Sequence, residues 1–347
     1  MARGKHQRRA RRGSVATVAT AVLVIAGGVA WAGVRFSHTG VTGEASTSST
    51  SNTTAGPVRT APLTGLPDPS GVSRTRSAVV VKVENTPDAL PQYGVEKADV
   101  VYEEIVNGGI TRLAAVYNSQ AAAWVGPVRS VRPTDTQIVW PIGGVFAYSG
   151  GAEYAIRSIS SAPVTMVDET HAGLAMVRWA SRYAPHNLFA NGLKLYGFHG
   201  RPVPPRPLFT YRADGAPVSG HPAVMVRVPF PSIYPVTWRW NAKSASWDRF
   251  LFGKLDVTGT HAVESPNNVV VMYVNYVNGI GTMSSYANLL GTGKAVIFTG
   301  GHQIVGTWSH LSQSAPITYQ TAKGPIALTP GQTWVELLNL GAPLSVR

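Results

Sequence analysis

The feature that most constrains this chain is an uncharged run of 21 residues, from Ser14 to Val34, rich in alanine and valine. A helix of this length can cross the hydrocarbon core of a bilayer. Six cations precede the run, at Arg3, Lys5, Arg8, Arg9, Arg11 and Arg12. Because positive flanks stay on the cytoplasmic side, the pattern predicts a cytoplasmic basic segment at 1–13, a membrane anchor at 14–34 and an extracytoplasmic body.

A cleaved signal peptide is the alternative, since Ala30-Trp31-Ala32 fits the small-residue pattern of a cleavage site. The anchor predicts a single-pass membrane protein and cleavage predicts a secreted one. Residues 35–61 are dominated by serine, threonine and glycine. Such a segment cannot bury enough apolar surface to fold, so it is interpreted as a flexible linker.

Composition narrows the chemistry of the body. The chain contains no cysteine, which excludes disulfides, thiolate nucleophiles and a lipid-bearing cysteine. The net charge of +13 falls to +7 from Arg35 onward, where 24 basic residues face 17 acidic ones. A mildly basic body favours an anionic envelope polymer, an envelope protein or a lipid surface as its partner, and no nucleic-acid partner is expected.

The hydrophobic pattern predicts an α+β protein with two domains. Between residues 62 and 205, apolar runs alternate with short helical stretches, so a mixed α/β sheet is expected there. From 206 to 347 the pattern changes to strands at turn-like spacing, which predicts a smaller all-β domain, a sandwich or a barrel. The strands expected in the first domain are 78–84, 100–106, 110–117, 123–128 and 144–148, with helices after Pro133, after Gly151 and near Leu193.

The Asn107-Gly108-Gly109 turn predicts a hairpin between two of these strands. A two-residue turn would place Glu103 opposite Arg112, and a three-residue loop would place Glu104 there. Either register brings a carboxylate to that guanidinium across the strands.

Arg129 and Arg132 are the most suggestive candidates for a binding site, because they precede a helix start at Thr134 with capping-box spacing to Gln137. Arginine forks beside free backbone N–H groups suit a phosphate or a carboxylate. The alternative is that both arginines pair with Glu103, Glu104 or Asp135 and serve only the fold.

Two further segments offer polar groups. Ser149-Gly150-Gly151 ends a strand and could aim N–H groups at the same anion, although Ala147 breaks the pattern of a serine nucleophile elbow. His186 lies in a loop-like stretch, where it could act as a base or make a structural hydrogen bond. The nine histidines show no metal-ligand spacing, so neither a metal nor a cofactor is expected.

Several motifs together resemble the YerB-like bacterial lipoproteins, an envelope family defined by a domain of unknown function. The similarity covers both domains. In the first it rests on Pro62-Leu63-Thr64-Gly65, Val83-Glu84-Asn85, Pro91-Gln92, Ala98-Asp99-Val100-Val101-Tyr102-Glu103, Gly108-Gly109-Ile110-Thr111-Arg112, Gly126-Pro127-Val128-Arg129-Ser130 and Pro185-His186-Asn187. In the second the match is looser and rests on Asn267-Asn268-Val269-Val270 and Pro330-Gly331-Gln332-Thr333-Trp334. The resemblance implies a two-domain envelope protein and no established activity. Members often carry a lipobox cysteine, and in its absence the expected tether is the segment 14–34.

The leading hypothesis is a non-catalytic binding or scaffolding protein of the cell envelope with an anion site. Its expected ligand-binding residues are Asn85, Arg112, Arg129, Arg132, Ser149, Gly150, Gly151, Arg182 and Asn187. The alternatives are an envelope hydrolase or transferase that uses Glu103 and His186 as acid and base, and a protein–protein adaptor.

Overall fold

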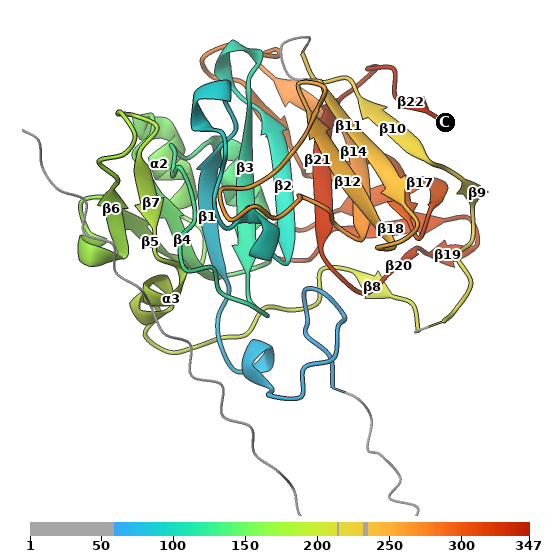
Figure 1. Cartoon of the computed structure of the whole chain (residues 1–347), viewed down its shortest axis with the longest axis horizontal. Coiled ribbons are helices and arrows are strands. Elements are labelled where there is room, and N and C mark those ends of the chain that lie inside the picture. The colour runs from blue at the N-terminus through green and yellow to red at the C-terminus, as the bar shows by residue number, and fades with distance from the viewer. Residues whose placement is uncertain (1–58, 214, 232–234) are drawn as a thin grey trace, which may run out of the picture. The chain divides into compact units, whose positions relative to one another are not determined.

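The computed structural model of the protein describes residues 59–213, 215–231 and 235–347 (Figure 1). The predicted segments 1–13 and 14–34, and nearly all of the predicted linker, lie outside these residues. Within the described ranges, no helix is both long and apolar enough to cross a membrane.

Valine-rich strands form the centre of the first half of the fold. In four of these strands every residue is buried. Strands that bury side chains on both faces require cover on both sides of the sheet. The strands are β1 (Val79–Glu84), β2 (Val100–Ile105), β3 (Thr111–Tyr117), β4 (Gly144–Tyr148) and the more exposed β5 (Val164–Asp168).

The three predicted helices are present and short: α1 (Pro133–Val139), α2 (Glu153–Ile159) and α3 (Gly192–Leu195). The strand predicted at 123–128 is wrong. This segment makes only isolated bridges, and Pro127 cannot donate a hydrogen bond to a ladder. Six 3₁₀ turns and one small hairpin complete this half: Val72–Arg74, Pro87–Ala89, Val95–Lys97, Asn107–Gly109, Gly173–Ala175, Tyr196–Phe198, β6 (Met176–Arg178) and β7 (Leu188–Ala190).

The second half is built of strands in its described residues, as expected. They are β8 (Thr210–Tyr211), β9 (His221–Pro222), β10 (Met225–Val228), β11 (Val236–Asn241), β12 (Ser246–Leu251), β13 (Lys254–Leu255), β14 (Asn268–Val277), β15 (Tyr286–Asn288), β16 (Gly291–Thr299), β17 (His302–His310), β18 (Thr318–Thr321), β19 (Gly324–Pro325), β20 (Ala327–Leu328), β21 (Thr333–Asn339) and β22 (Ser345–Val346).

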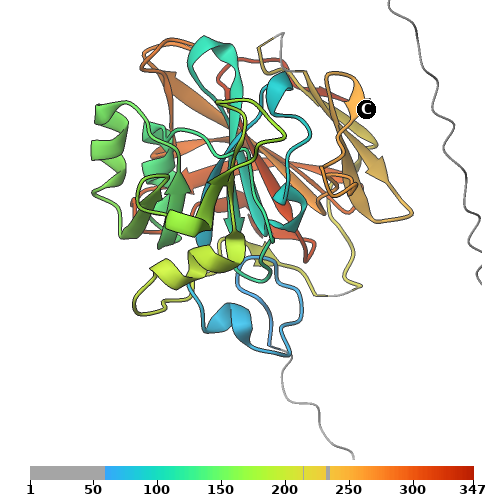
Figure 2. The same cartoon turned by 60° about the vertical axis from the view of Figure 1, so that its left-hand side comes forward.

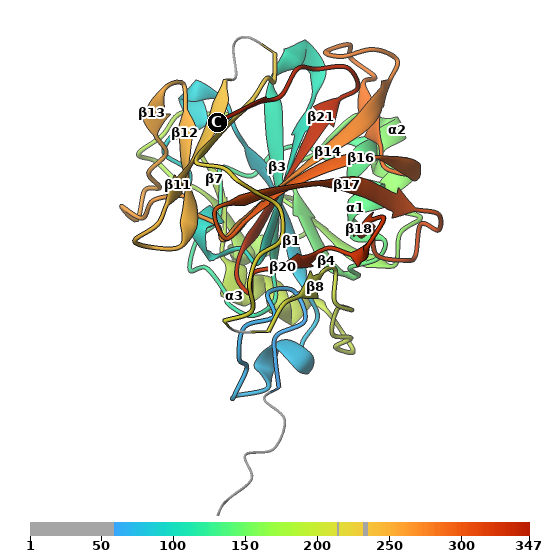
Figure 3. The same ribbon diagram turned by 90° about the vertical axis from the view of Figure 1, so that its right-hand side faces the viewer.

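These strands do not close into a barrel of their own, which corrects that part of the prediction. β21 pairs in parallel with β2, so the halves share one sheet in the order β19-β18-β17-β16-β14-β21-β2-β3-β1-β4-β5. A smaller sheet, β13-β12-β11-β10-β22, is separate. The large sheet is strongly twisted, as Figure 3 shows where β17 crosses the direction of β3.

Two layers cover the large sheet. Helices α1 and α2 lie on one side of it, and β11, β12 and β13 lie on the other (Figures 2 and 3). Trp238 of β11 packs edge-on against Trp334 of β21, with 5.2 Å between ring centroids, and both rings are fully buried. This contact joins the small sheet to the large one.

Strand direction determines where loops meet. β1 and β4 are parallel, and both β1 and β2 are antiparallel to β3. The carboxyl ends of β1, β2 and β4 therefore lie at the same edge of the sheet. Ligands of open α/β sheets bind outside this edge.

Candidate functional site

Arg129 and Arg132 lie at the carboxyl edge of the sheet because residues 126–132 run along the end of β1. The Glu84 N–H donates to the Pro127 carbonyl at 2.9 Å, and the Arg129 N–H donates to the Lys82 carbonyl at 2.8 Å. These bonds fix the backbone of the segment beside a strand whose residues are all buried. Arg132 then caps α1, since its N–H donates to a carboxylate oxygen of Asp135 at 2.6 Å.

The 149–151 loop holds the same segment from the other side. Ser149 N–H donates to the Arg129 carbonyl at 2.9 Å, and the Gly150 carbonyl accepts from Val131 N–H at 3.1 Å. Gly151 is required here, because a Cβ at its φ of +156° would lie 2.6 Å from a Val131 methyl. The predicted proximity of Ser149, Gly150 and Gly151 to the arginines is therefore seen, with the Ser149 N–H already used by the backbone.

The hairpin adopts the three-residue alternative, and Glu104 lies opposite Arg112. No ion pair joins Arg112 to a carboxylate among the described residues, however. The Arg112 side chain donates from Nη1 to the Ser130 carbonyl at 3.1 Å, and its buried Nε has no partner there. Arg112 is only 6% exposed.

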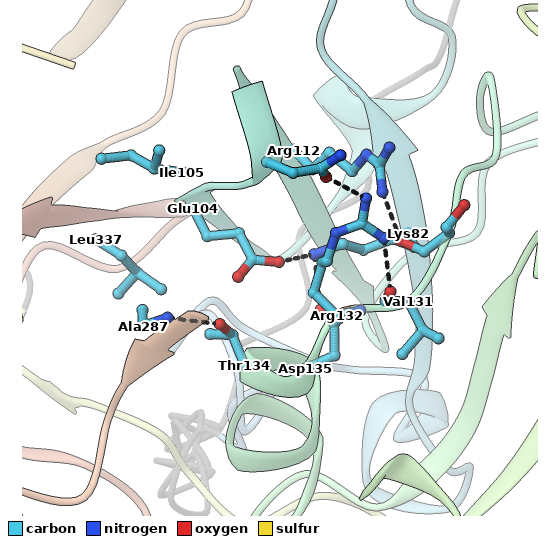
Figure 4. Close-up of polar contacts among 12 residues, drawn as sticks. Lys82, Glu104, Ile105, Arg112, Val131, Arg132, Thr134, Asp135, Ala287 and Leu337 are labelled. Carbon is cyan, nitrogen blue, oxygen red and sulfur yellow. Dashed lines mark hydrogen bonds and ion pairs between the residues drawn. The ribbon is translucent and has the colours of Figure 1, made fainter. Parts of the chain in front are cut away.

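Charge around Arg112 is poorly balanced. Burial, and then the neighbouring Arg132 and Arg129, lowers the pKa of Arg112 from 12.5 to about 9. The carboxylates of Glu104 and Glu84 only partly oppose this shift, and the guanidinium is still charged at neutral pH. Figure 4 shows the Arg112 and Arg132 side chains beside each other, above Lys82.

Glu104 is drawn away from Arg112 by Lys82, which projects from β1 and is fully buried. The Lys82 ammonium pairs with Glu104 and, at 2.7 Å, with Asp135. Burial raises the pKa of Asp135 to about 6, against the opposing effect of Lys82. Sequence reasoning missed Lys82, although a single lysine inside a run of valines was a visible signal.

Glu84 is the ion-pair partner of Arg129. One of its oxygens lies 3.0 Å from Nη2 of Arg129, and the other lies 2.9 Å from Nδ1 of His186. Thr86 donates to the first oxygen at 2.9 Å. The prediction that Arg129 pairs with a carboxylate was thus right in kind and wrong in partner, since Glu84 takes the place of Glu103, Glu104 or Asp135.

Glu103 and His186 have different partners, which contradicts the acid–base pair considered from the sequence. Glu103 is fully buried, accepts from Asn85 at 3.0 Å and pairs with Arg249 of β12 at 2.6 Å. His186 contacts Glu84 instead. Glu103 faces the opposite side of β2 from Glu104, as alternation along a strand requires.

Three predicted ligand residues are occupied within the protein. Asn85 is fully buried and bonds to Glu103 and to Thr111. Arg182 donates to two backbone carbonyls, at 2.9 and 2.6 Å. Asn187 accepts from Arg178 at 2.8 Å. These side chains support the fold, and they do not join the arginine cluster, by which we mean Arg112, Arg129 and Arg132.

A second buried charge cluster surrounds Arg249. The guanidinium pairs with Asp256 and Glu103 and lies 4.6 Å from the centroid of the Trp334 ring. Glu336 is next to Glu103 in the β2–β21 register. Burial, and then Glu103, raises the pKa of Glu336 well above its ordinary value. No group of metal-ligand side chains is found in the described part of the chain.

The fold and its charged sheet edge define a two-part protein of a recognised but functionally uncharacterised class. Residues 63–200 match the N-terminal domain, and residues 226–335 the C-terminal domain, of the family described as "Protein of unknown function (DUF3048)". The chain belongs to this family.

Two comparisons connect the chain to one bacterial protein. A relative described as "Putative lipoprotein YerB", from Bacillus subtilis (strain 168), is 40% identical over 101 residues, which are 29% of this chain and 30% of that protein's length. The crystal structure of the YerB protein from Bacillus subtilis matches with a TM-score of 0.72 at 23% identity, covering 83% of this chain and 99% of that one. The structural likeness shows the fold.

Proposed function

We propose that this chain is an extracytoplasmic cell-envelope protein that binds an anionic group of an envelope polymer or envelope protein through Arg112, Arg129 and Arg132. The lipoprotein description of the relative supports an envelope location. The predicted membrane segment at 14–34 supplies the tether in this proposal, with the body outside the cytoplasm. The net charge of +7 beyond Arg35 favours an anionic partner.

The proposal rests mainly on Arg112, a buried arginine without a carboxylate partner among the described residues. An arginine that is 6% exposed ordinarily has a carboxylate partner, and this one donates one hydrogen bond to a carbonyl while its buried Nε has no partner in the described structure. Leaving a buried charged group unsatisfied costs more than the roughly 1–3 kcal/mol lost with a neutral one. A bound oxyanion would remove that cost.

The charge balance supports the same conclusion. Lys82 and the arginine cluster contribute four positive charges, and Glu84, Glu104 and Asp135 contribute three negative charges. The ammonium and one guanidinium use all three carboxylates. Two guanidiniums are left with neutral oxygen partners, the Ser130 carbonyl for Arg112, and the Val131 carbonyl and the Asn107 side chain for Arg132.

The arginine cluster can be reached from solvent at Arg129. The Arg129 side chain is 22% exposed, and both Gly150 and Gly151 are exposed. No atom lies within 4 Å of the position that a Cβ at Gly150 would occupy, so the space above the loop is open. Arginine guanidiniums bind phosphate and carboxylate groups in bidentate fashion. A phosphate or a carboxylate is therefore the anionic group that we expect the cluster to bind.

Calorimetric titration with polyphosphate tests the proposal. The Arg129→Met plus Arg132→Met variant should bind at least tenfold more weakly than wild type, since each hydrogen bond to a charged group is worth about 1.5–3 kcal/mol. The matched control is Arg201→Met plus Arg227→Met, which removes the same charge from two exposed positions. Equal weakening in both variants would show that only net charge matters and would contradict the assignment.

A further inference from the structure

A cavity lies near the arginine cluster, between α1, α2 and the segments around β15. It has a volume of about 310 Å³. Its lining contains two tyrosines, three side-chain amides and several hydroxyl groups, with no acidic or basic side chain. The tyrosines and amides are Tyr154, Tyr286, Gln137, Asn278 and Gln313.

Several of these polar groups are free to bind a ligand. The Tyr286 hydroxyl and both ends of the Gln313 amide have no hydrogen-bond partner among the described residues. Gln137 uses its oxygen to accept from Leu289 N–H at 2.6 Å, which leaves its amide NH₂ available. Asn278 donates to the Ser284 carbonyl at 3.3 Å, and its side-chain oxygen remains.

This combination selects a neutral polyhydroxylated ligand. Amides and hydroxyls supply both donors and acceptors, and a tyrosine ring has an apolar face with a polar tip. At about 30 Å³ per water molecule, the cavity holds on the order of ten waters, close to the number of non-hydrogen atoms in one hexose. An ion would find no counter-charge here, and a purely apolar ligand would leave the amides unpaired.

The cavity is connected to the arginine cluster by short contacts. Nη2 of Arg132 donates to Oδ1 of Asn107 at 2.6 Å, and Nδ2 of Asn107 lies 3.8 Å from the Met283 sulfur. The Met283 carbonyl then accepts from the Tyr154 hydroxyl at 2.9 Å. Pro133, the residue after Arg132, also lines the cavity.

We infer that this cavity is a saccharide subsite, so that the ligand of the proposed anion site is an acidic glycan whose sugar ring occupies the cavity and whose anionic group reaches the arginines. The inference rests on the proposed function for the anionic group only. The sugar subsite itself stands on the cavity lining.

The test compares three probes by calorimetry: oligomers of glucuronate, galacturonate and mannuronate, the neutral methyl esters of these oligomers, and polyphosphate. Tyr286→Phe plus Gln313→Ala removes the Tyr286 hydroxyl and the Gln313 amide from the cavity, and Tyr183→Phe plus Gln120→Ala is the control at exposed positions. The cavity variant should bind at least one charged oligomer and its ester about tenfold more weakly, and should bind polyphosphate unchanged. The control variant should match wild type throughout.

The outcomes separate the two claims. One outcome is that wild type binds polyphosphate, while the Tyr286→Phe plus Gln313→Ala variant binds every oligomer as wild type does. That outcome would overturn the saccharide subsite and leave the anion site intact. A second outcome is that wild type binds a methyl ester more tightly than the cavity variant does, and binds no polyphosphate. That outcome would overturn the anion site and leave the subsite intact. A charged oligomer that binds no better than its ester would show that the sites do not share a ligand and would overturn the acidic glycan.

Discussion

Glu264 should make the stability of this protein depend on pH. Its side chain is buried, and neither carboxylate oxygen has a hydrogen-bond partner in the part of the chain that the structure describes. Burial, and then Asp256 and Glu96, raises the pKa of Glu264 well above its ordinary 4.5, and the nearby Arg249 only partly opposes this. Glu264 is therefore protonated in the folded protein at pH values where the unfolded chain has already released that proton.

The sign and size of the effect follow from proton linkage. Because the folded pKa is the higher one, the contribution of Glu264 is most favourable below pH 4.5 and is lost as the pH rises toward the folded pKa. Within that window the free energy of unfolding falls by about 1.4 kcal/mol per pH unit for one proton. Glu264→Gln keeps the shape of the side chain and removes the titration.

Urea unfolding of wild type and Glu264→Gln at pH 5, 6 and 7 measures the difference directly. The free energy of unfolding of the variant should rise relative to that of wild type as the pH increases from 5, by up to about 1.4 kcal/mol per pH unit until the folded pKa of Glu264 is reached. Glu169→Gln is the control, because Glu169 is an exposed carboxylate in a surface ion pair with Arg178. A difference between variant and wild type that does not change with pH would refute the reasoning.

Three further predictions concern the sheet edge. Lys82→Met should lower the free energy of unfolding by about 3–5 kcal/mol in urea titrations, because it leaves two buried carboxylates without their counter-charge. Glu84→Gln should bind polyphosphate several-fold more tightly by calorimetry, because it frees Arg129 from a competing carboxylate, whereas Glu169→Gln should not. Gly151→Ala should weaken polyphosphate binding relative to wild type, because the added Cβ pushes the loop off the arginine segment.

Local elements of this fold could be predicted because each has a short-range cause. The Asn107-Gly108-Gly109 turn limited the hairpin to two registers, and one of them is observed. The valine runs identified β1 and β2, and the turn spacing identified the second half as strand-rich. The register alone could not give the partner of Glu104, because the competing Lys82 belongs to a third strand.

Long-range pairings were not predictable from these local patterns. β2 and β21 are more than 220 residues apart in the chain, and no sequence period indicates that two such strands will pair in parallel. A separation of 146 residues likewise concealed Arg249, which pairs with Glu103 from β12 and removes Glu103 from the candidate site. The arginines were found because Arg129 and Arg132 lie within one short segment, whereas Glu84 and His186 meet there only through the fold.

The most direct test of the central claim is to locate an oxyanion in a crystal of the protein. Crystals grown with tungstate, measured at the tungsten absorption edge, should show an anomalous peak whose oxygens lie within hydrogen-bond distance, roughly 2.7–3.2 Å, of the Arg112 and Arg129 side chains. The same peak should be absent from crystals of the Arg129→Met plus Arg132→Met variant. A wild-type structure at saturating tungstate with no peak between these arginines would contradict the anion site.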